Sequence, residues 1–371
     1  MMDRTIPENN RVLLGLSGGV DSTAAALLLR EKGFEVTGLF FDVLGDQQAE
    51  REAAERTAKE LEIPFLYRNV KDQFRDQVIS YFCRSYLSGE TPNPCVLCNP
   101  TVKFRVMREA ADETGAYYLA TGHYARVGYS REEDRWFIRR GASLKKDQSY
   151  MLYRLDQSIL SRLLLPLGDT EEKETTRRLV RENGIHNADK KDSQEICFIR
   201  EGSYVDYIEK QGAVSPPGDF ASLQGQILGR HQGLLHYTVG QRKGLGITFG
   251  KPTFVVGLDP LKNQVILGDN EDLFKTTVFA KDIRLNCYED GTGPLPDAWE
   301  GKKVYAKIRY AAQPSEAALY RDGGDGVRVE FSQPQRAPTP GQSLVFYDGD
   351  RLLGGGFITS KKENPSTAHR E

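Results

Sequence analysis

The sequence predicts an α/β domain built on a parallel sheet, followed by a small, mainly β central domain and a C-terminal antiparallel β-barrel. Up to about residue 200, short apolar runs alternate with segments of helical periodicity, which is typical of a parallel sheet with helices on both faces. After residue 212, glycine and proline become frequent and short β-type runs replace the helices. Beyond residue 279 these runs recur about every ten residues between turns, which favours a small antiparallel barrel.

The elements of the first domain follow from their apolar spacing and from Gly and Pro at their borders. Strands are predicted at residues 11–16, 33–41 (after an initial turn), 65–70 and 117–121, and helices at residues 23–30, 47–61, 74–87 and 102–115. The segment 91–99 contains two prolines and an asparagine, so it is predicted to form a rigid turn without regular structure.

The remainder of the chain is predicted to be mostly strand and turn. The β-type runs are residues 226–228, 254–257, 264–267, 303–310, 316–320, 326–331, 343–347 and 355–359. We therefore expect domains at residues 1–204, 205–279 and 280–360, followed by a polar tail at 361–371 that we expect to be mobile.

Composition excludes several classes of protein. A length of 371 residues predicts two or three domains, and five cysteines are too few for a disulfide framework. No apolar stretch is long enough to span a membrane, and the first ten residues lack the apolar region of a signal peptide. We expect a cytoplasmic protein without a membrane partner. The net charge of −2 does not indicate nucleic-acid binding, so any RNA contact would rest on local basic clusters.

A glycine-rich turn joins the first predicted strand to the first predicted helix. It consists of Gly15, Leu16, Ser17, Gly18, Gly19, Val20, Asp21 and Ser22. Such a turn presents free amides and the positive end of a helix dipole to an anion, and glycines permit close approach. Because Asp21 would repel a phosphate, we expect Mg²⁺ between them. The spacing is neither a Walker loop nor a Rossmann fingerprint. The S-G-G-x-D-S pattern resembles the pyrophosphate-binding loop of the N-type ATP pyrophosphatases, which implies ATP.

The cysteines differ in their surroundings. Cys95 and Cys98 form a C-x-x-C pair in the predicted turn, and this pattern fits a redox pair, half a zinc site or iron–sulfur ligation. Cys197 follows a charged segment and begins an apolar run, where a core cysteine is the usual interpretation. Cys83 and Cys287 lie in helical and strand patterns, and we interpret both as core residues.

Several longer motifs follow one another along the chain. They are residues 15–22 (GLSGGVDS), 91–99 (TPNPCVLCN), 120–125 (ATGHYA), 146–150 (KDQSY), 193–198 (SQEICF, beginning with Ser193) and 236–244 (HYTVGQRKG). Together they resemble the tRNA-specific 2-thiouridylases, from about residue 11 to residue 359. The resemblance implies ATP-dependent 2-thiolation of the wobble uridine in the tRNAs for lysine, glutamate and glutamine. ATP would adenylate the C2 oxygen, and sulfur from a cysteine persulfide would then displace AMP.

The resemblance also implies roles for individual residues. Cys98 matches the nucleophile and Cys197 the persulfide carrier, and their reaction would leave a Cys98–Cys197 disulfide. The ATP-binding positions are Gly15, Leu16, Ser17, Gly18, Gly19, Val20, Asp21, Ser22, Phe41 and Gly122. Asn93, Pro94 and Cys95 match the segment that contacts the flipped-out target base. The expected tRNA contacts are His123, Lys146, Asp147, Gln148, Arg309, Tyr310 and Gln342. The sulfur donor would be a cysteine desulfurase or a relay carrier protein.

Cys95 departs from the family pattern, since members often carry aspartate at this position. The departure leaves the proton-handling group open, and it provides three thiols, Cys95, Cys98 and Cys197, that can ligate a [4Fe–4S] cluster. Thiolation through such a cluster is therefore an alternative to the persulfide route. Two other classes stay open: an ATP-dependent amide-forming synthetase with the same loop, and a non-catalytic tRNA-binding protein.

Overall fold

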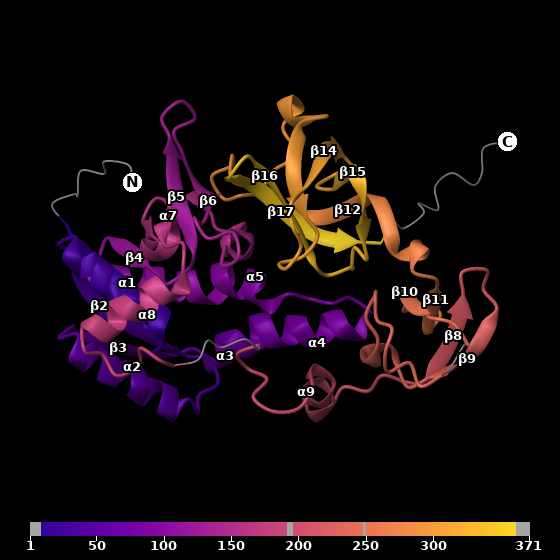
Figure 1. Cartoon of the computed structure of the whole chain (residues 1–371), viewed down its shortest axis with the longest axis horizontal. Helices are drawn as coiled ribbons and strands as arrows, with labels where there is room; N and C mark the ends of the chain where they lie inside the picture. Colours follow the sequence, from indigo (N-terminus) through magenta and orange to yellow (C-terminus); the bar gives the residue numbers. More distant parts are fainter. Residues whose placement is uncertain (1–8, 191–195, 248–249, 361–371) are drawn as a thin grey trace.

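The computed structural model describes residues 9–190, 196–247 and 250–360. Ser193, with the rest of residues 191–195, and the tail expected at 361–371 lie outside the described residues. The described chain forms three sheets. In Figure 1 the N-terminal α/β part lies on the left, the C-terminal barrel at the upper right and a small four-stranded sheet at the lower right.

The first sheet is parallel throughout. Its order is β3 (Phe65–Asn69), β2 (Glu35–Asp42), β1 (Arg11–Gly15), β4 (Tyr118–Ala120) and β7 (Leu163–Leu164). Side chains of β1 alternate between two cores: Val12 and Leu14 pack with α1 (Val20–Glu31), whereas Leu13 packs with α6 (Phe104–Thr114). Helices therefore cover both faces, and the predicted architecture of this domain is confirmed.

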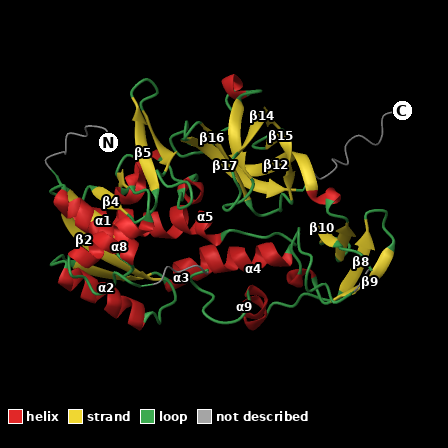
Figure 2. Cartoon of the chain, in the orientation of Figure 1, coloured by secondary structure: helices red, strands yellow, loops and turns green. Residues whose placement is uncertain are grey.

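The predicted helices at residues 47–61 and 74–87 are present. They are α2 (Gln48–Glu60) and a helix made of α3 (Lys71–Phe74), a π-helical turn (Arg75–Ile79) and α4 (Ser80–Leu87). Helices α7 (Gln157–Leu160), α8 (Lys173–Glu182) and α9 (Tyr204–Lys210) were not predicted. The segment from α3 to α4 is one continuous helix, which begins slightly before the predicted residue 74. Helices α1 and α8 pack side by side (Figure 2).

The prediction that residues 91–99 lack regular structure was wrong. Helix α5 (Pro94–Cys98) continues through a π-helical turn (Asn99–Lys103) directly into α6. Asn93 caps α5, and Pro94 occupies the first helical position, where a missing N–H costs nothing. Pro100 lies in the π-helical turn, whose wider spacing accommodates a residue that would break a regular α-helix. Pro94 and Pro100 are therefore both compatible with a helix at these positions.

A hairpin inside the first domain was not predicted. Strands β5 (Ala125–Ser130) and β6 (Arg135–Arg140) pair with each other, and Arg139 of β6 pairs with Arg351 of β17 (Arg351–Thr359). The hairpin thereby joins the sheet of the C-terminal barrel, so the first and last parts of the chain share one eight-stranded sheet.

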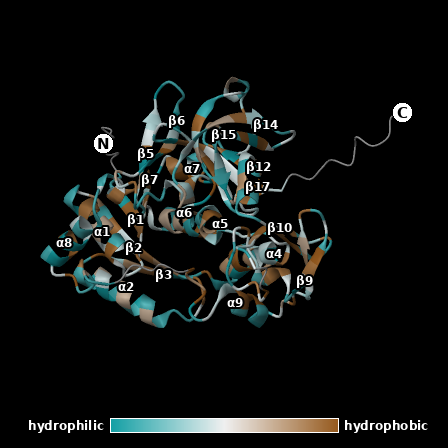
Figure 3. Ribbon diagram, turned by 45° about the vertical axis from the view of Figure 1, so that its right-hand side comes forward, coloured by the Kyte–Doolittle hydropathy of each residue, from teal (hydrophilic) through white to brown (hydrophobic). Residues whose placement is uncertain are grey.

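The two β regions have the predicted character. The small sheet has the order β10 (Phe254–Asp259), β11 (Gln264–Gly268), β8 (Gly218–Ser222) and β9 (Ile227–His231). The barrel contains β12 (Phe274–Leu285), β15 (Val327–Arg336), β14 (Ser315–Arg321), β13 (Lys303–Lys307), β16 (Ser343–Asp348) and β17. Pairing of β12 with β17 closes it, and its apolar side chains form a separate core. Figure 3 shows both hydrophobic (brown) and hydrophilic (teal) residues along these strands.

Candidate functional site

The carboxyl ends of three neighbouring parallel strands meet at the glycine-rich turn. A Cβ on Gly15, at the end of β1, would lie 3.4 Å from the ring of Phe41 on β2. A Cβ on Gly122, just after β4, would lie 2.9 Å from the backbone of Asp21. The convergence of these positions, which the strand order predicts, is therefore present.

Gly18 shows why the turn requires glycine. Its φ is +67°, and a Cβ would lie 2.8 Å from the amide nitrogen of Ala54 on α2, so the backbone of the turn packs directly against that helix. Gly19 caps α1 without a side-chain hydrogen bond. The first-turn amides of a helix have no intrahelical acceptor, so those of α1 are suited to phosphate oxygens.

Serine hydroxyls organise the same turn. The hydroxyl of Ser22 accepts a hydrogen bond from the amide of Ser17 (3.2 Å) and donates one to the carbonyl of Gly19 (3.0 Å). Buried Asn187 donates to the carbonyl of Gly18 (3.1 Å) and to the hydroxyl of Thr23 (2.8 Å). Asn187 was missed at the sequence level, because no local pattern around it indicates that it reaches this turn.

Asp21 is held by two side chains from other elements. The ammonium of Lys173, at the start of α8, donates to both carboxylate oxygens (2.6 Å and 2.7 Å). The hydroxyl of Tyr124 donates to one of these oxygens (2.7 Å). Carboxylate and hydroxyl oxygens are the ligands that Mg²⁺ prefers, and the exposed amides suit a polyphosphate, so the residues present fit ATP with Mg²⁺. Lys173 was also missed, since it lies far along the chain from the turn.

Helix α5 holds the C-x-x-C pair in a fixed orientation. Asn93 accepts a hydrogen bond from the amide of Cys95 (3.2 Å), and its amide group lies 3.5 Å from the sulfur of Met151. Buried Asn99 donates to the carbonyl of Met151 (2.9 Å). The two asparagines therefore anchor both ends of α5 to one neighbouring segment.

The structure brings Cys197 to the C-x-x-C pair. Cys98 packs against the same apolar cluster as Ile196 and Phe198, the neighbours of Cys197 in the chain. As whole residues Cys95 and Cys197 are solvent-exposed and Cys98 is partly buried, although protein surrounds all three thiols. Within the described residues, no three His, Cys, Asp or Glu side chains are arranged to hold a metal ion. The three cysteines thus gather without adopting the geometry of cluster ligands.

All three thiols are surrounded by protein that disfavours the thiolate. Burial raises the pKa of Cys98 to about 12 and that of Cys197 to about 11, and it also raises the pKa of Cys95. The ammonium of Lys103 opposes this effect at each cysteine. The three thiols also interact electrostatically with one another. Lys103 is a cation that acts on all three.

His123 is a neutral neighbour of this group. Burial and the charge of Lys103 lower its pKa to about 3, and its ring stacks on Phe104 at 6.4 Å. Its Nδ1 lies 2.7 Å from the hydroxyl of Thr121. A contact from His123 to RNA would therefore use an uncharged imidazole.

Three of the expected tRNA contacts have side chains engaged within the protein. Asp147 is buried and accepts from the amide of Gly141 (3.0 Å) and the hydroxyl of Ser149 (2.9 Å). Gln148 accepts from the amide of Tyr124 (3.0 Å). Gln342 donates to the carbonyl of Thr91 (2.8 Å). The polar groups of these side chains therefore stabilise the protein around the site through hydrogen bonds within the chain.

Tyr310 brings the barrel to the cysteines. Its ring lies 6.0 Å from that of Tyr150 and 5.6 Å from the ammonium of Lys307. Burial raises the pKa of Tyr310, and the nearby groups of Asp147 and Cys95 raise it further. Arg309 donates to the carbonyl of Arg336 (3.3 Å). Lys146 is partly buried beside this region.

Comparison with known proteins follows the same division of the chain. Residues 10–201 match the family model described as the tRNA methyl transferase HUP domain, residues 205–269 the tRNA methyl transferase PRC-barrel domain and residues 279–358 the aminomethyltransferase beta-barrel domain. A tRNA-specific 2-thiouridylase from Clostridioides difficile is 43% identical, over 94% of this chain and 98% of its own. One from Caldanaerobacter subterraneus is 44% identical, over 95% and 99%. The chain belongs to the tRNA-specific 2-thiouridylase family.

Family membership confirms the resemblance stated from the motifs and the three-part fold. It also agrees with the use of ATP, which the loop predicts. Across the described residues, no helix combines the length and apolar character needed to cross a bilayer.

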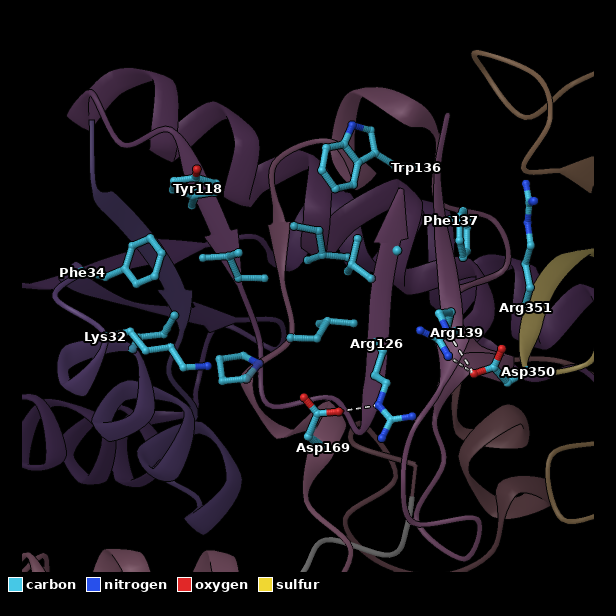
Figure 4. A pocket seen from close by; sticks show the side chains of 17 residues that line it. Lys32, Phe34, Tyr118, Arg126, Trp136, Phe137, Arg139, Asp169, Asp350 and Arg351 are labelled. Carbon is cyan, nitrogen blue, oxygen red and sulfur yellow. Dashed lines mark hydrogen bonds and ion pairs between the residues drawn. The ribbon is translucent and has the colours of Figure 1, made fainter. Parts of the chain in front are cut away.

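A separate cavity lies between the parallel sheet and the hairpin of β5 and β6. It has a volume of about 830 Å³ and is lined by Phe34, Tyr118 and Trp136 among others, with Phe34 and Tyr118 at the amino ends of β2 and β4 (Figure 4). Its rim carries the ion pairs Arg126–Asp169 (2.6 Å) and Arg139–Asp350 (2.6 Å). None of the site residues predicted from the sequence lines this cavity.

Proposed function

We propose that this protein catalyses ATP-dependent 2-thiolation of the wobble uridine in the tRNAs for lysine, glutamate and glutamine, in the cytoplasm. The observation that carries the proposal is the similarity to tRNA-specific 2-thiouridylases over nearly the full length of both chains. The meeting of a phosphate-binding turn and a cysteine group in one region supports it.

The first step is activation of the uridine. ATP lies along residues 15–22, with its adenine beside Phe41 and Gly122, and the C2 oxygen attacks the α-phosphate to release pyrophosphate. Amides at the start of α1 stabilise the charge that develops on the pyrophosphate, because they are oriented before the reaction. Mg²⁺, held by Asp21, would screen the phosphates from one another. AMP attached to C2 is a far better leaving group than the oxygen alone.

The second step transfers sulfur. A persulfide donor, either a cysteine desulfurase or a relay carrier, places a sulfane sulfur on Cys197. The thiolate of Cys98 attacks the inner sulfur of this persulfide, the Cys98–Cys197 disulfide forms, and the terminal sulfur leaves with its electron pair. That sulfide attacks C2 and displaces AMP. The exchange requires a thiolate and close approach of the sulfurs, and the packing of Cys98 beside residues 196 and 198 supports this.

The RNA is held by surfaces on both sides of the cysteines. Asn93, Pro94 and Cys95 contact the extruded base, since C2 is not reachable in a stacked nucleotide. The tRNA backbone and neighbouring bases contact His123, Lys146, Asp147, Gln148, Arg309, Tyr310 and Gln342.

Mass spectrometry of wobble uridine tests the proposal. Purified protein, ATP, Mg²⁺, tRNA and a persulfide donor should yield 2-thiouridine, whereas Cys98→Ala and Cys197→Ala should yield none. Pyrophosphate release that depends on a small amine or carboxylate and not on tRNA would instead indicate an amide-forming synthetase. Binding of tRNA without ATP consumption would indicate a non-catalytic protein.

The iron–sulfur route is separated from the persulfide route by a further measurement. Protein purified without oxygen should contain no stoichiometric iron, and Cys95→Ala should retain thiolation. Four irons per chain, lost together with activity in Cys95→Ala, would favour the cluster.

A further inference from the structure

The thiol of Cys95 takes no part in the sulfur transfer of the persulfide route. It lies on α5 three residues before Cys98, and as a residue it is more exposed to solvent than Cys98. In a helix, residues at this spacing lie on one face with Cα atoms about 5 Å apart. Disulfides span Cα distances of about 4.4–6.8 Å, so the pair can be oxidised without unwinding the chain.

We propose that Cys95 resolves the disulfide left by sulfur transfer: it attacks the Cys98 sulfur, forms a Cys95–Cys98 disulfide and releases Cys197. This inference rests on the proposed function, since it concerns the same catalytic cycle. It assigns to the cysteine at position 95 a role that an aspartate there cannot perform.

The exchange balances in atoms and electrons. The bond between Cys98 and Cys197 breaks, the bond between Cys95 and Cys98 forms, and the proton lost by Cys95 is taken up by the Cys197 thiolate. No net oxidation occurs, because the disulfide only moves from one pair to the other. An external dithiol then reduces the Cys95–Cys98 disulfide and becomes a disulfide itself.

Proximity favours this order of events. Two sulfurs fixed one helical turn apart react as an intramolecular pair, which outcompetes a dissolved thiol for the same disulfide. The exchange moves the disulfide onto Cys95, a more exposed residue than Cys98, which favours access by an external dithiol. It also returns Cys197 to the thiol form, ready to accept the next sulfane sulfur. Burial raises the pKa of Cys95, but the positive charge of Lys103 lowers it and so favours the thiolate.

Disulfide mapping after one turnover tests the proposal. Full-length protein with a persulfide on Cys197 is mixed with ATP, Mg²⁺ and tRNA without reductant, quenched in acid, alkylated and digested. Mass spectrometry measures each disulfide per mole of 2-thiouridine formed. We expect mainly Cys95–Cys98 in the wild type, and mainly Cys98–Cys197 in both Cys95→Ser and Cys95→Asp.

The aspartate variant separates a thiol relay from a proton-handling role, since it restores a carboxylate but cannot exchange disulfides. Cys83→Ser is the matched control, and its pattern should equal that of the wild type. A wild type that accumulates Cys98–Cys197 as fully as Cys95→Ser, or that pairs Cys197 with Cys95 or Cys83, overturns the inference while the proposed function stands. Thiolated tRNA without any disulfide overturns the inference and the persulfide route, and absence of thiolated tRNA overturns the proposed function together with it.

Discussion

Lys173 lies with its ammonium 2.6 Å and 2.7 Å from the two carboxylate oxygens of Asp21, although 152 positions separate these residues in the chain. The lysine is mostly buried, with 15% of its side chain exposed, and the aspartate is 35% exposed. The ion pair neutralises a negative charge at the position where a polyphosphate is expected. This relationship gives α8 a direct role at the glycine-rich turn.

Replacing Lys173 by methionine should weaken ATP binding by about 10-fold to 100-fold, because a charge-assisted hydrogen bond contributes roughly 1.5–3 kcal/mol. The carboxylate of Asp21 would then depend on Mg²⁺ alone for neutralisation beside the phosphates. Isothermal calorimetry with ATP at several Mg²⁺ concentrations measures the effect, and Lys173→Arg should restore part of it. Lys251→Met, which removes an exposed pair with Asp269 (2.7 Å), is the matched control. Unchanged ATP affinity in Lys173→Met would contradict this prediction.

Gly18→Ala should abolish ATP binding. The new Cβ would meet the Ala54 amide at 2.8 Å in a left-handed conformation, so the turn must move. Gly33→Ala provides the control, since Gly33 has a similar φ of +81° and a Cβ added there would meet no atom within 4 Å. Gly33→Ala should cost about 1 kcal/mol of stability and leave ATP binding intact. Thermal unfolding and calorimetry on both variants measure the difference, and equal loss of ATP binding would refute the packing argument.

Gln342→Ala should loosen the segment that leads into α5. Gln342 donates to the Thr91 carbonyl (2.8 Å), and the Thr91 amide donates to the Pro340 carbonyl (2.8 Å), so a turn of the barrel holds this segment. Hydrogen exchange at residues 91–95 should accelerate in the absence of RNA. The control is Gln335→Ala, whose side chain donates to the Gln333 carbonyl within β15 (2.9 Å). If only tRNA affinity falls and exchange stays constant, Gln342 acts on RNA instead.

The two catalytic thiols should react slowly at neutral pH. Because burial raises the pKa of Cys98 to about 12 and that of Cys197 to about 11, alkylation rates should rise about tenfold per pH unit from pH 7 to pH 9.

The folded protein keeps these protons at pH values where the unfolded chain loses them. Stability should therefore fall as pH rises from about 9 towards 12, and less steeply in Cys98→Ser than in the wild type. Peptide mapping after iodoacetamide and denaturation at pH 8 and pH 10 check both parts. A plateau in alkylation below pH 8 would show that the thiols are not protected by burial.

His123 should remain neutral throughout the physiological range. With its pKa lowered to about 3, its contribution to stability is present above the unfolded pKa of about 6.5 and is lost as pH falls towards 3. NMR of the imidazole carbons should show no titration between pH 5 and pH 8. Lys103→Met should raise the pKa of His123, since the lysine charge is one cause of the shift. A midpoint near 6.5 in the wild type would disprove the buried, uncharged state.

The predictable parts of this fold are those that depend on local pattern. The strand, glycine turn and helix around residues 11–31 follow from apolar spacing and from the need for glycine at Gly18, and the structure confirms all three. The parallel order then places Phe41 and Gly122 near the turn. Proline was misleading at residue 94, because its effect on a helix depends on its position within that helix.

The unpredicted parts depend on contacts between distant segments. Nothing near Lys173 or Asn187 indicates that each reaches the glycine-rich turn, and nothing near Arg139 indicates pairing with Arg351. The hydrogen bonds that the side chains of Asp147 and Gln342 make within the protein were likewise not predictable from the sequence.

The sequence alone determined the order of the domains, the family and the chemical groups available: a phosphate-binding turn, three cysteines and the residues around them. Each of these depends on the identity and local spacing of residues, which the chain states directly. Only the tertiary structure decided which groups face one another, how far burial disfavours the thiolates and which side chains the protein itself uses. Those properties arise from packing between segments far apart in the chain, where distance and desolvation rather than residue type set the energy.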